Sequence, residues 1–237
     1  MDPQLSLLLN GIVSGLLLGG LYAAAAAGLA VSFGMLDIVN IAHPALMVMG
    51  AFTVVVIGTA LGLDPLLVAL LQAPLFYVIG IGIYGIYHHF FERRGEEALQ
   101  GLAFFFGVMF IVEVGLVMAF GPEQRFLDPD YAFITWRLGE IDLPLRMLVP
   151  AVLALTVVGL LILWLRRSFT GLAIAAVAQD AEALRLMAVD PVRIKRLAFG
   201  ISIALAAMAG GALVVVQPVE PASGQIFIGR VFAIVIM

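Results

Sequence analysis

A short polar run, with side chains that recur every three residues, is the first candidate for chemistry in this 237-residue chain. Asp37, Asn40 and His43 lie between two apolar stretches, directly before Pro44. Proline lacks a backbone donor and begins or breaks a helix. Polar groups at such a place can satisfy the backbone of a broken membrane helix. They can equally form a capped turn, in which Asn40 caps one helix and His43 caps the next. Both interpretations stay open.

Glu113 is a single carboxylate deep inside an apolar stretch, LAFFFGVMFIVEVGLVMAF. An ionisable group at that depth is costly and usually faces protein or water. We expect structural pairing before a role beside a solute path, and stabilisation as a neutral acid is a third possibility. His88 and His89 lie beside Glu92 and Arg93, and we interpret them as polar groups at a membrane boundary rather than as a metal site.

A basic loop, residues 166–196, holds six of the twelve basic residues: Arg166, Arg167, Arg185, Arg193, Lys195 and Arg196. Residues 172–187 of this loop are mostly helix formers. Asp180, Glu182 and Arg185 give that helix a polar face, and Asp190-Pro191 ends it and begins the next. A short amphipathic helix of this kind can lie on lipid, pack under its own bundle or insert into a groove on a partner.

Composition decides the class of protein that must position these residues. The chain is 63% hydrophobic and only 12% charged, with a mean hydropathy of +1.15. So few charges cannot cover the surface of a soluble domain of this size. We therefore predict an all-α, polytopic transmembrane bundle forming one domain over residues 1–237. Six stretches are long enough to span, and a seventh run is too short: 5–33, 44–61, 66–91, 98–120, 146–165, 197–216 and then 226–237.

Small residues recur every four positions in the first stretch. One row is Gly11, Gly15, Gly19, Ala23 and Ala27, and a parallel row is Gly20, Ala24 and Gly28. Such rows let helices approach closely. The row either packs inside the chain or lines an interface with a partner subunit.

Charge placement predicts the orientation. By the positive-inside rule, loop 92–97 and the basic loop are cytoplasmic. The acidic loop, residues 121–145, and the N-terminus are then outside. The segment 34–43 is placed in the cytoplasm by helix parity alone.

Several chemistries are excluded by missing motifs. Lys195 is the only lysine, and no G-x-x-x-x-G-K-[ST] motif is present, so ATP binding by a P-loop is excluded. There are no cysteines and no H-E-x-x-H. No extended cationic surface exists for nucleic acid. We expect no enzyme activity, no cofactor and no bound metal.

Two segments together resemble the permeases of branched-chain amino acid ABC importers. The basic loop fits the family pattern at Gly171, Ala175, Ala178, Asp180, Ala183, Val189, Asp190, Arg193, Lys195, Ala198 and Phe199. The N-terminal region fits it at Gly15, Gly19, Tyr22, Ala23, Gly28, Leu29, Phe33, Gly34, Asn40, Ala42, His43, Met49, Gly50 and Ala51.

The chain also departs from the family pattern. Pro44, Ala176 and Ala188 stand where the family usually has glycine, arginine and glycine. The family's stretch after the third span is shortened to ERRG. Since the family continues with further spans, we expect this chain to be C-terminally truncated.

The resemblance implies an importer permease that works by alternating access in the inner membrane of a prokaryote. Its partners would be two ATP-hydrolysing subunits, a second permease, homologous or identical, an extracytoplasmic solute-binding protein and the lipid bilayer. Branched-chain amino acids are the expected solutes, although similar permeases carry other amino acids, urea or short amides. The alternative is a stand-alone secondary transporter or channel, which would need ionisable groups along its path.

The resemblance also implies roles for the two sets of site residues. The contact with the ATPase would be made by Gly171, Ala175, Asp180, Glu182, Arg185, Asp190 and Arg193. Asn40 and His43 are candidates for the translocation path, and Glu113 joins them because of its depth in an apolar stretch rather than because of the resemblance.

Overall fold

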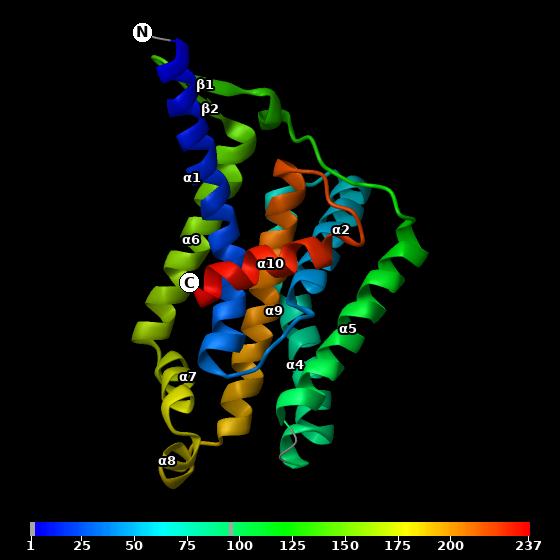
Figure 1. Ribbon diagram of the computed structural model, residues 1–237, viewed down its shortest axis with the longest axis vertical. Coiled ribbons are helices and arrows are strands. Elements are labelled where there is room, and N and C mark those ends of the chain that lie inside the picture. Colours follow the sequence, from blue (N-terminus) through cyan, green and yellow to red (C-terminus); the bar gives the residue numbers. More distant parts are fainter. Residues whose placement is uncertain (1–2, 95–96) are drawn as a thin grey trace.

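The computed structural model describes residues 3–94 and 97–237, which fold into a helical bundle (Figure 1). Met1 and Asp2 belong to the N-terminus, and Gly95 and Glu96 belong to the predicted loop 92–97. These four residues are not among those that the structure describes. The α-helices are α1 (Pro3–Leu29), α2 (His43–Leu61), α3 (Pro65–Leu71), α4 (Ala73–Phe90), α5 (Glu97–Phe120), α6 (Leu145–Arg167), α7 (Phe169–Gln179), α8 (Ala181–Leu186), α9 (Pro191–Val216) and α10 (Ser223–Ile236). A π-helical turn, η1 (Ala30–Met35), extends α1, and the 3-10 turns are η2 (Glu92–Arg94) and η3 (Asp130–Phe133).

The predicted all-α membrane protein is confirmed. Within the described ranges, five helices are long and apolar enough to span a membrane, or six if α3 and α4 count as one. The predicted 66–91 span is not a continuous helix, because α3 and α4 meet at a bend of 41°. Pro74, in the first turn of α4, has no backbone donor to continue the ladder of α3. The run 226–237 belongs to α10, whose 14 residues extend only about 21 Å.

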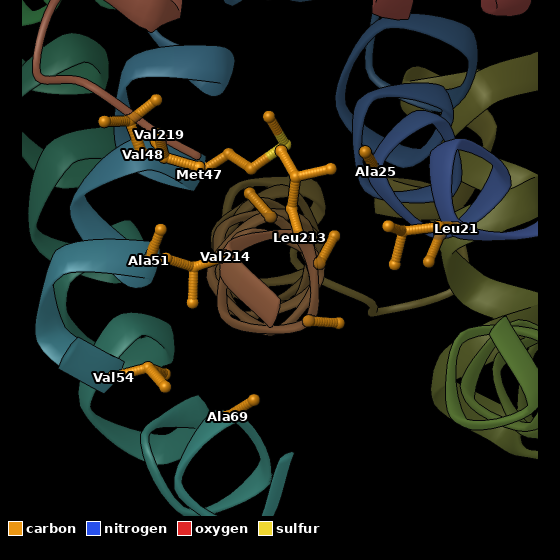
Figure 2. Close-up of a cluster of buried hydrophobic side chains, with 14 of the residues drawn as sticks. Leu21, Ala25, Met47, Val48, Ala51, Val54, Ala69, Leu213, Val214 and Val219 are labelled. Atoms are coloured by element: carbon orange, nitrogen blue, oxygen red, sulfur yellow. The ribbon is translucent and has the colours of Figure 1, made fainter. Parts of the chain in front are cut away.

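Helix α9 is the centre of the bundle. Its most apolar 18-residue window is 83% buried, and it packs against α1, α2, α3, α4 and α6. Leu213 and Val214 lie between α1 and α2 (Figure 2). Their neighbours are Leu21 and Ala25 of α1 and Met47, Val48, Ala51 and Val54 of α2.

Glycine lets α9 approach its neighbours this closely. A Cβ on Gly210 would overlap the backbone carbonyl of Met47 in α2. A Cβ on Gly80 of α4 would lie 2.9 Å from the Cα of Gly200 in α9. Any larger residue would force the backbones apart, so these contacts fix the α2–α9 and α4–α9 spacing.

The acidic loop contains a hairpin that the helix-based prediction missed. Strands β1 (Thr135–Leu138) and β2 (Ile141–Pro144) pair antiparallel, with Leu138 opposite Ile141. Gly139, at φ 67°, supplies the left-handed residue of the turn. The Asn10 side chain bonds the carbonyl of Glu140 and the amide of Asp142 at 3.1 and 2.7 Å. The hairpin therefore covers the end of α1 that begins the chain (Figure 1).

Figure 1 places the basic loop, with α7 and α8, at the opposite end of the bundle from the hairpin. Lys195 of α9 binds Glu92 of η2, so the two loops predicted to be cytoplasmic share one end. This is the same-side arrangement that helix parity predicts.

Candidate functional site

The site is built around α7 and α8, which follow α6 at the loop end of the bundle. Ser168 caps α7 by accepting a hydrogen bond from the Gly171 amide at 2.9 Å. Gly171 is buried, and a Cβ there would overlap the backbone of Leu165 in α6. Ala175 is half-buried one turn later. Gly171 thus sets how closely α7 folds back against α6.

The predicted single helix over 172–187 is wrong, because the chain breaks at Asp180. Helix α7 ends at Gln179, and Asp180 is extended, with φ −157° and ψ 102°. Its carboxylate accepts hydrogen bonds from the amides of Glu182 at 2.9 Å and Ala183 at 3.0 Å. Aspartate stabilises a helix start better than a helix interior, which explains the break. Asp180 is therefore an N-cap rather than part of a helical polar face.

Helix α8 presents both charged and apolar side chains at its tip. Glu182 and Arg185 are exposed, and so are Leu186 and Met187, at 90% and 76%. Leu184, at 7% exposure, is the residue that anchors α8 to the bundle. Two large apolar side chains this exposed at the end of a loop form a surface suited to a protein partner.

The connection from α8 to α9 is fixed by a second cap. Asp190 accepts a hydrogen bond from the Val192 amide at 2.9 Å and lies 3.4 Å from Arg193. Ala188 has a φ of 59°, a left-handed conformation that favours glycine. This is a position at which the resemblance pattern has glycine, so the departure costs the chain some backbone strain.

A partly buried polar cluster joins this loop to α4. The Glu92 carboxylate accepts hydrogen bonds from Lys195 Nζ at 2.6 Å and Tyr84 OH at 2.7 Å, and His88 Nδ1 lies 2.6 Å away. Burial alone would raise the pKa of Glu92, but the hydrogen bonds from Lys195, Tyr84 and His88 outweigh it and lower that pKa. Sequence reasoning placed His88 beside Glu92 but missed Tyr84 and Lys195 as partners of that carboxylate.

A groove of about 420 Å³ lies between the cluster and α8. Glu182 and Arg185 line one side, and His88, Glu92 and Lys195 line another. The groove therefore combines both signs of charge next to the exposed apolar tip of α8.

Of the polar run before Pro44, Asn40 and His43 lie within the bundle, whereas Asp37 is exposed. Asn40 and His43 are fully buried; Asn40 Oδ1 accepts from the Ala42 amide at 3.1 Å, and His43 Nε2 lies 3.1 Å from the Ala25 carbonyl. Asp37 has a φ of 57° in the turn after η1. Asn40 thus stabilises the turn before α2 through the Ala42 amide, while His43 links the start of α2 to α1.

Glu113 is 6% exposed and pairs with an amide rather than with a basic group. Gln225 Nε2 of α10 donates to Glu113 Oε2 at 2.9 Å, and a Cβ on Gly224 would lie 2.8 Å from Oε1. The carboxylate therefore holds the start of α10 against α5.

A family model described as the permease component of branched-chain amino acid transport systems matches residues 11–237. The chain belongs to this permease family. It is therefore a membrane protein of a transport family. A curated relative, the high-affinity branched-chain amino acid transport system permease protein BraD of Pseudomonas aeruginosa, is 24% identical over 220 residues, covering 87% of this chain and 71% of the relative. No solved structure matches significantly.

The permease brings together only part of the predicted residue set. Glu182 and Arg185 share the groove, while Asp180 and Asp190 act as helix caps at its edges. Gly171 and Ala175 lie on α7, which carries no groove residue. Among the described residues, no cluster of three potential metal ligands was found.

Proposed function

We propose that this permease is the membrane-spanning subunit of an ABC importer for branched-chain amino acids or similar small polar solutes. Two separate ATPase subunits drive it between outward-open and inward-open states. A solute-binding protein delivers the solute from outside, where the acidic loop and the N-terminus lie. The basic loop faces the cytoplasm of a prokaryotic cell. Family membership supports the transport role, and the geometry of α8 supports the link to an ATPase.

The observation that carries the coupling proposal is the exposed tip of α8. Leu186 and Met187 have no apolar cover there, and Glu182 and Arg185 flank them beside the groove. An ATPase subunit that contacts this tip would bury the apolar side chains and pair with the charges. Coupling requires such contacts to differ between the two states of the importer.

The supports of α8 allow a push on the tip to reach the spanning helices. Asp180 fixes the start of α8 and Asp190 fixes the start of α9, each by capping backbone amides with its carboxylate. Lys195 then links α9 to Glu92 at the end of α4. Gly171 and Arg193 belong to the same contact region in this proposal, at the start of α7 and of α9.

The proposed path residues act by shaping the bundle. Asn40 and His43 hold the break between η1 and α2, each keeping one buried polar atom free of a protein partner: Asn40 Nδ2 and His43 Nδ1. Glu113 fixes α10, which lies beside α2. These residues would set where the path narrows.

A second permease has a prepared surface on α1. At Gly11, Gly15 and Gly19 an added Cβ would meet no atom within 4 Å, so these three glycines are not needed for packing against the described residues. In the parallel row, Gly28 would meet the Ser202 carbonyl at 2.8 Å. The outer row therefore suits a helix of a second permease.

The test is co-purification in mild detergent with the ATPase subunits encoded beside the permease. We compare the wild type with a Glu182→Arg, Arg185→Glu double variant and a Leu186→Glu variant. These residues are exposed and cap no helix, so the bundle stays folded. Arg137→Glu, at 81% side-chain exposure on the hairpin, is the charge-reversal control.

We expect the ATPase to co-purify with the wild type and the control, and to be lost from both tip variants. Uptake should require ATP. Folded wild-type protein that retains no ATPase, and transports without ATP, would favour the stand-alone carrier instead.

A further inference from the structure

Helix α1 does not end as an α-helix. Its continuation, η1 (Ala30–Met35), is π-helical, so each of its turns holds one residue more than an α-helical turn. The chain then passes through Asp37, at φ 57°, and reaches α2 at His43. π-Helical turns are rare, bend helices and recur at functional sites. This end of α1 is therefore a place where the helix can change its hydrogen-bond register.

Three buried side chains, one each from η1, α2 and α9, bond to backbone carbonyls near the end of α1. These carbonyls lie at positions i, i+3 and i+4, and therefore on one side of the helix. A helix that changes between α and π registers exchanges the backbone donors of such carbonyls, and a side-chain donor can keep them bonded meanwhile. The bonds are Ser32 Oγ to Leu29 at 3.1 Å, His43 Nε2 to Ala25 at 3.1 Å and Ser202 Oγ to Gly28 at 2.6 Å.

Gly28 is the point at which α1, α2 and α9 meet. A Cβ on Gly28 would lie 2.8 Å from the Ser202 carbonyl and 2.9 Å from His43 Cε1. Ser32, His43 and Ser202 are all 0% exposed. The described residues already enclose these groups, so the junction does not depend on what else covers the bundle. It holds the end of α1 where η1 begins.

The π-helical turn also contacts the basic loop. It packs against α7 as well as α9, and the end of α1 lies beside α7 in Figure 1. Val31 of η1 and the adjoining Leu36 are 3% and 4% exposed. They share a buried apolar cluster with Ile174 and Val177 of α7. Because such a cluster is close-packed, a shift of α7 must either displace η1 or open the cluster.

We infer that η1 is a hinge that passes motion of α7 into the end of α1. A shift of α7 moves η1, the π-helical turn changes its register, and the segment that leads to Asn40 shifts with it. Ser202 and His43 are positioning residues, because they hold carbonyls of α1 while η1 changes. The inference rests on the proposed function, since it requires a motor that moves the basic loop.

The first experiment measures whether η1 moves. The chain has no cysteine, so introduced cysteines can carry spin labels at chosen sites. Leu16→Cys and Gly34→Cys place one label on α1 and one on η1; Leu16 is 71% exposed, and a Cβ on Gly34 would meet no atom within 4 Å. Leu99→Cys and Met118→Cys, near the two ends of the continuous helix α5, form the matched control pair.

Label distances are measured by double electron–electron resonance on the complete importer in proteoliposomes, without nucleotide and with a non-hydrolysable ATP analogue. We expect the α1–η1 distance to change by about 2 Å or more, the scale of helix shifts in switching proteins. The α5 distance should stay the same. An unchanged α1–η1 distance, in an importer that takes up leucine, overturns the inference and leaves the proposed function standing.

The second experiment removes the extra residue of the π-helical turn. Deletion of Ala30 lets α1 continue as an α-helix, which fixes one register. We expect the deletion to lower leucine uptake per ATP hydrolysed about 5-fold or more, and to abolish the change in label distance. The ATPase subunits should still co-purify, because the tip of α8 is unaltered.

Ser202→Ala tests the bond from α9 without shortening the chain. It should lower leucine uptake per ATP hydrolysed by a smaller factor, about 2-fold. Thr156→Ala removes a similar hydroxyl-to-carbonyl bond, of 2.7 Å within α6, and should leave this ratio unchanged. A merely structural role for Ser202 would lower stability and keep the ratio constant.

Wild-type uptake per ATP by the Ala30 deletion overturns the inference, since a fixed register would then transport equally well. If the deletion variant does not fold, the label distances support or overturn the hinge without it. A wild-type importer in which no ATPase binds the permease overturns the proposed function, and the inference with it.

Discussion

Removing the cation of the Glu92 cluster should destabilise the permease by about 2–3 kcal/mol. In Lys195→Met, the Glu92 carboxylate, whose side chain is only 10% exposed, loses a partner 2.6 Å away. Breaking a fully buried ion pair costs about 3–5 kcal/mol. The Lys195 side chain is 20% exposed, so water recovers part of that cost. The hydrogen bonds from Tyr84 and His88 remain and limit the loss further.

The assay is a double-mutant cycle of wild type, Lys195→Met, Glu92→Gln and the double variant. Unfolding in mild detergent by added SDS is followed by circular dichroism. We expect a coupling energy of about 1–2 kcal/mol between the two sites. Arg193→Met is the matched control on the same helix, because its pair with Asp190 has side-chain exposures of 83% and 50%. That variant should cost less than about 1 kcal/mol.

Low pH should destabilise the permease through the same Glu92 carboxylate. Because the pKa of Glu92 is lowered in the folded state, its stabilisation is complete above the ordinary glutamate pKa of about 4.3. It is lost as the pH falls further, through the lowered value. The wild type should therefore lose more stability than Glu92→Gln below about pH 4. A coupling energy below about 0.5 kcal/mol, or equal acid sensitivity in both proteins, would refute the link between η2 and α9.

Three further predictions concern backbone fit and the buried acid. Gly210→Ala should cost at least about 3 kcal/mol, because its methyl group would overlap the Met47 carbonyl. Gly15→Ala, where the methyl group meets no atom, should instead stabilise the isolated permease by up to about 1 kcal/mol through helix propensity. Equal SDS unfolding curves for the two variants would contradict the close α2–α9 contact. Ala188→Gly should stabilise the permease by about 1 kcal/mol by relieving the left-handed strain, and a lower melting temperature would contradict that reading. Glu113→Gln should keep uptake dependent on ATP, since the new amide oxygen can still accept a hydrogen bond; uptake that instead lost a dependence on an ion gradient would indicate a coupled carrier.

Much of the fold follows from apolar length alone. A stretch of about 20 apolar residues can satisfy its backbone in lipid only as a helix, so the predicted 44–61 stretch closely matches α2 (His43–Leu61). The prediction of one continuous span over 66–91 was wrong because hydropathy does not record the effect of Pro74 on the backbone. The hairpin was missed because its residues lie outside the spans, where pairing with Asn10 and Gly139 decides the structure.

The site was harder to predict than the spans. Composition predicted a helix in the basic loop. Whether that helix continues through Asp180, or ends there so that Asp180 caps a new helix, depends on local backbone geometry. The Glu92–Lys195 pair joins residues 103 positions apart, and no local pattern indicates such a contact. The family resemblance identified the loop; only the three-dimensional arrangement shows that Leu186 and Met187 are its most exposed apolar side chains.

The central place of α9 also determines how the protein can be made. Gly28, Gly50 and Gly80 belong to helices that are synthesised early, yet all three have close neighbours in α9. A ribosome that has released α1 to α6 into the membrane has therefore delivered α1, α2 and α4 before the helix against which all three pack. The packing of these three helices on α9 must wait until residue 216 has been inserted, so this part of the bundle assembles late.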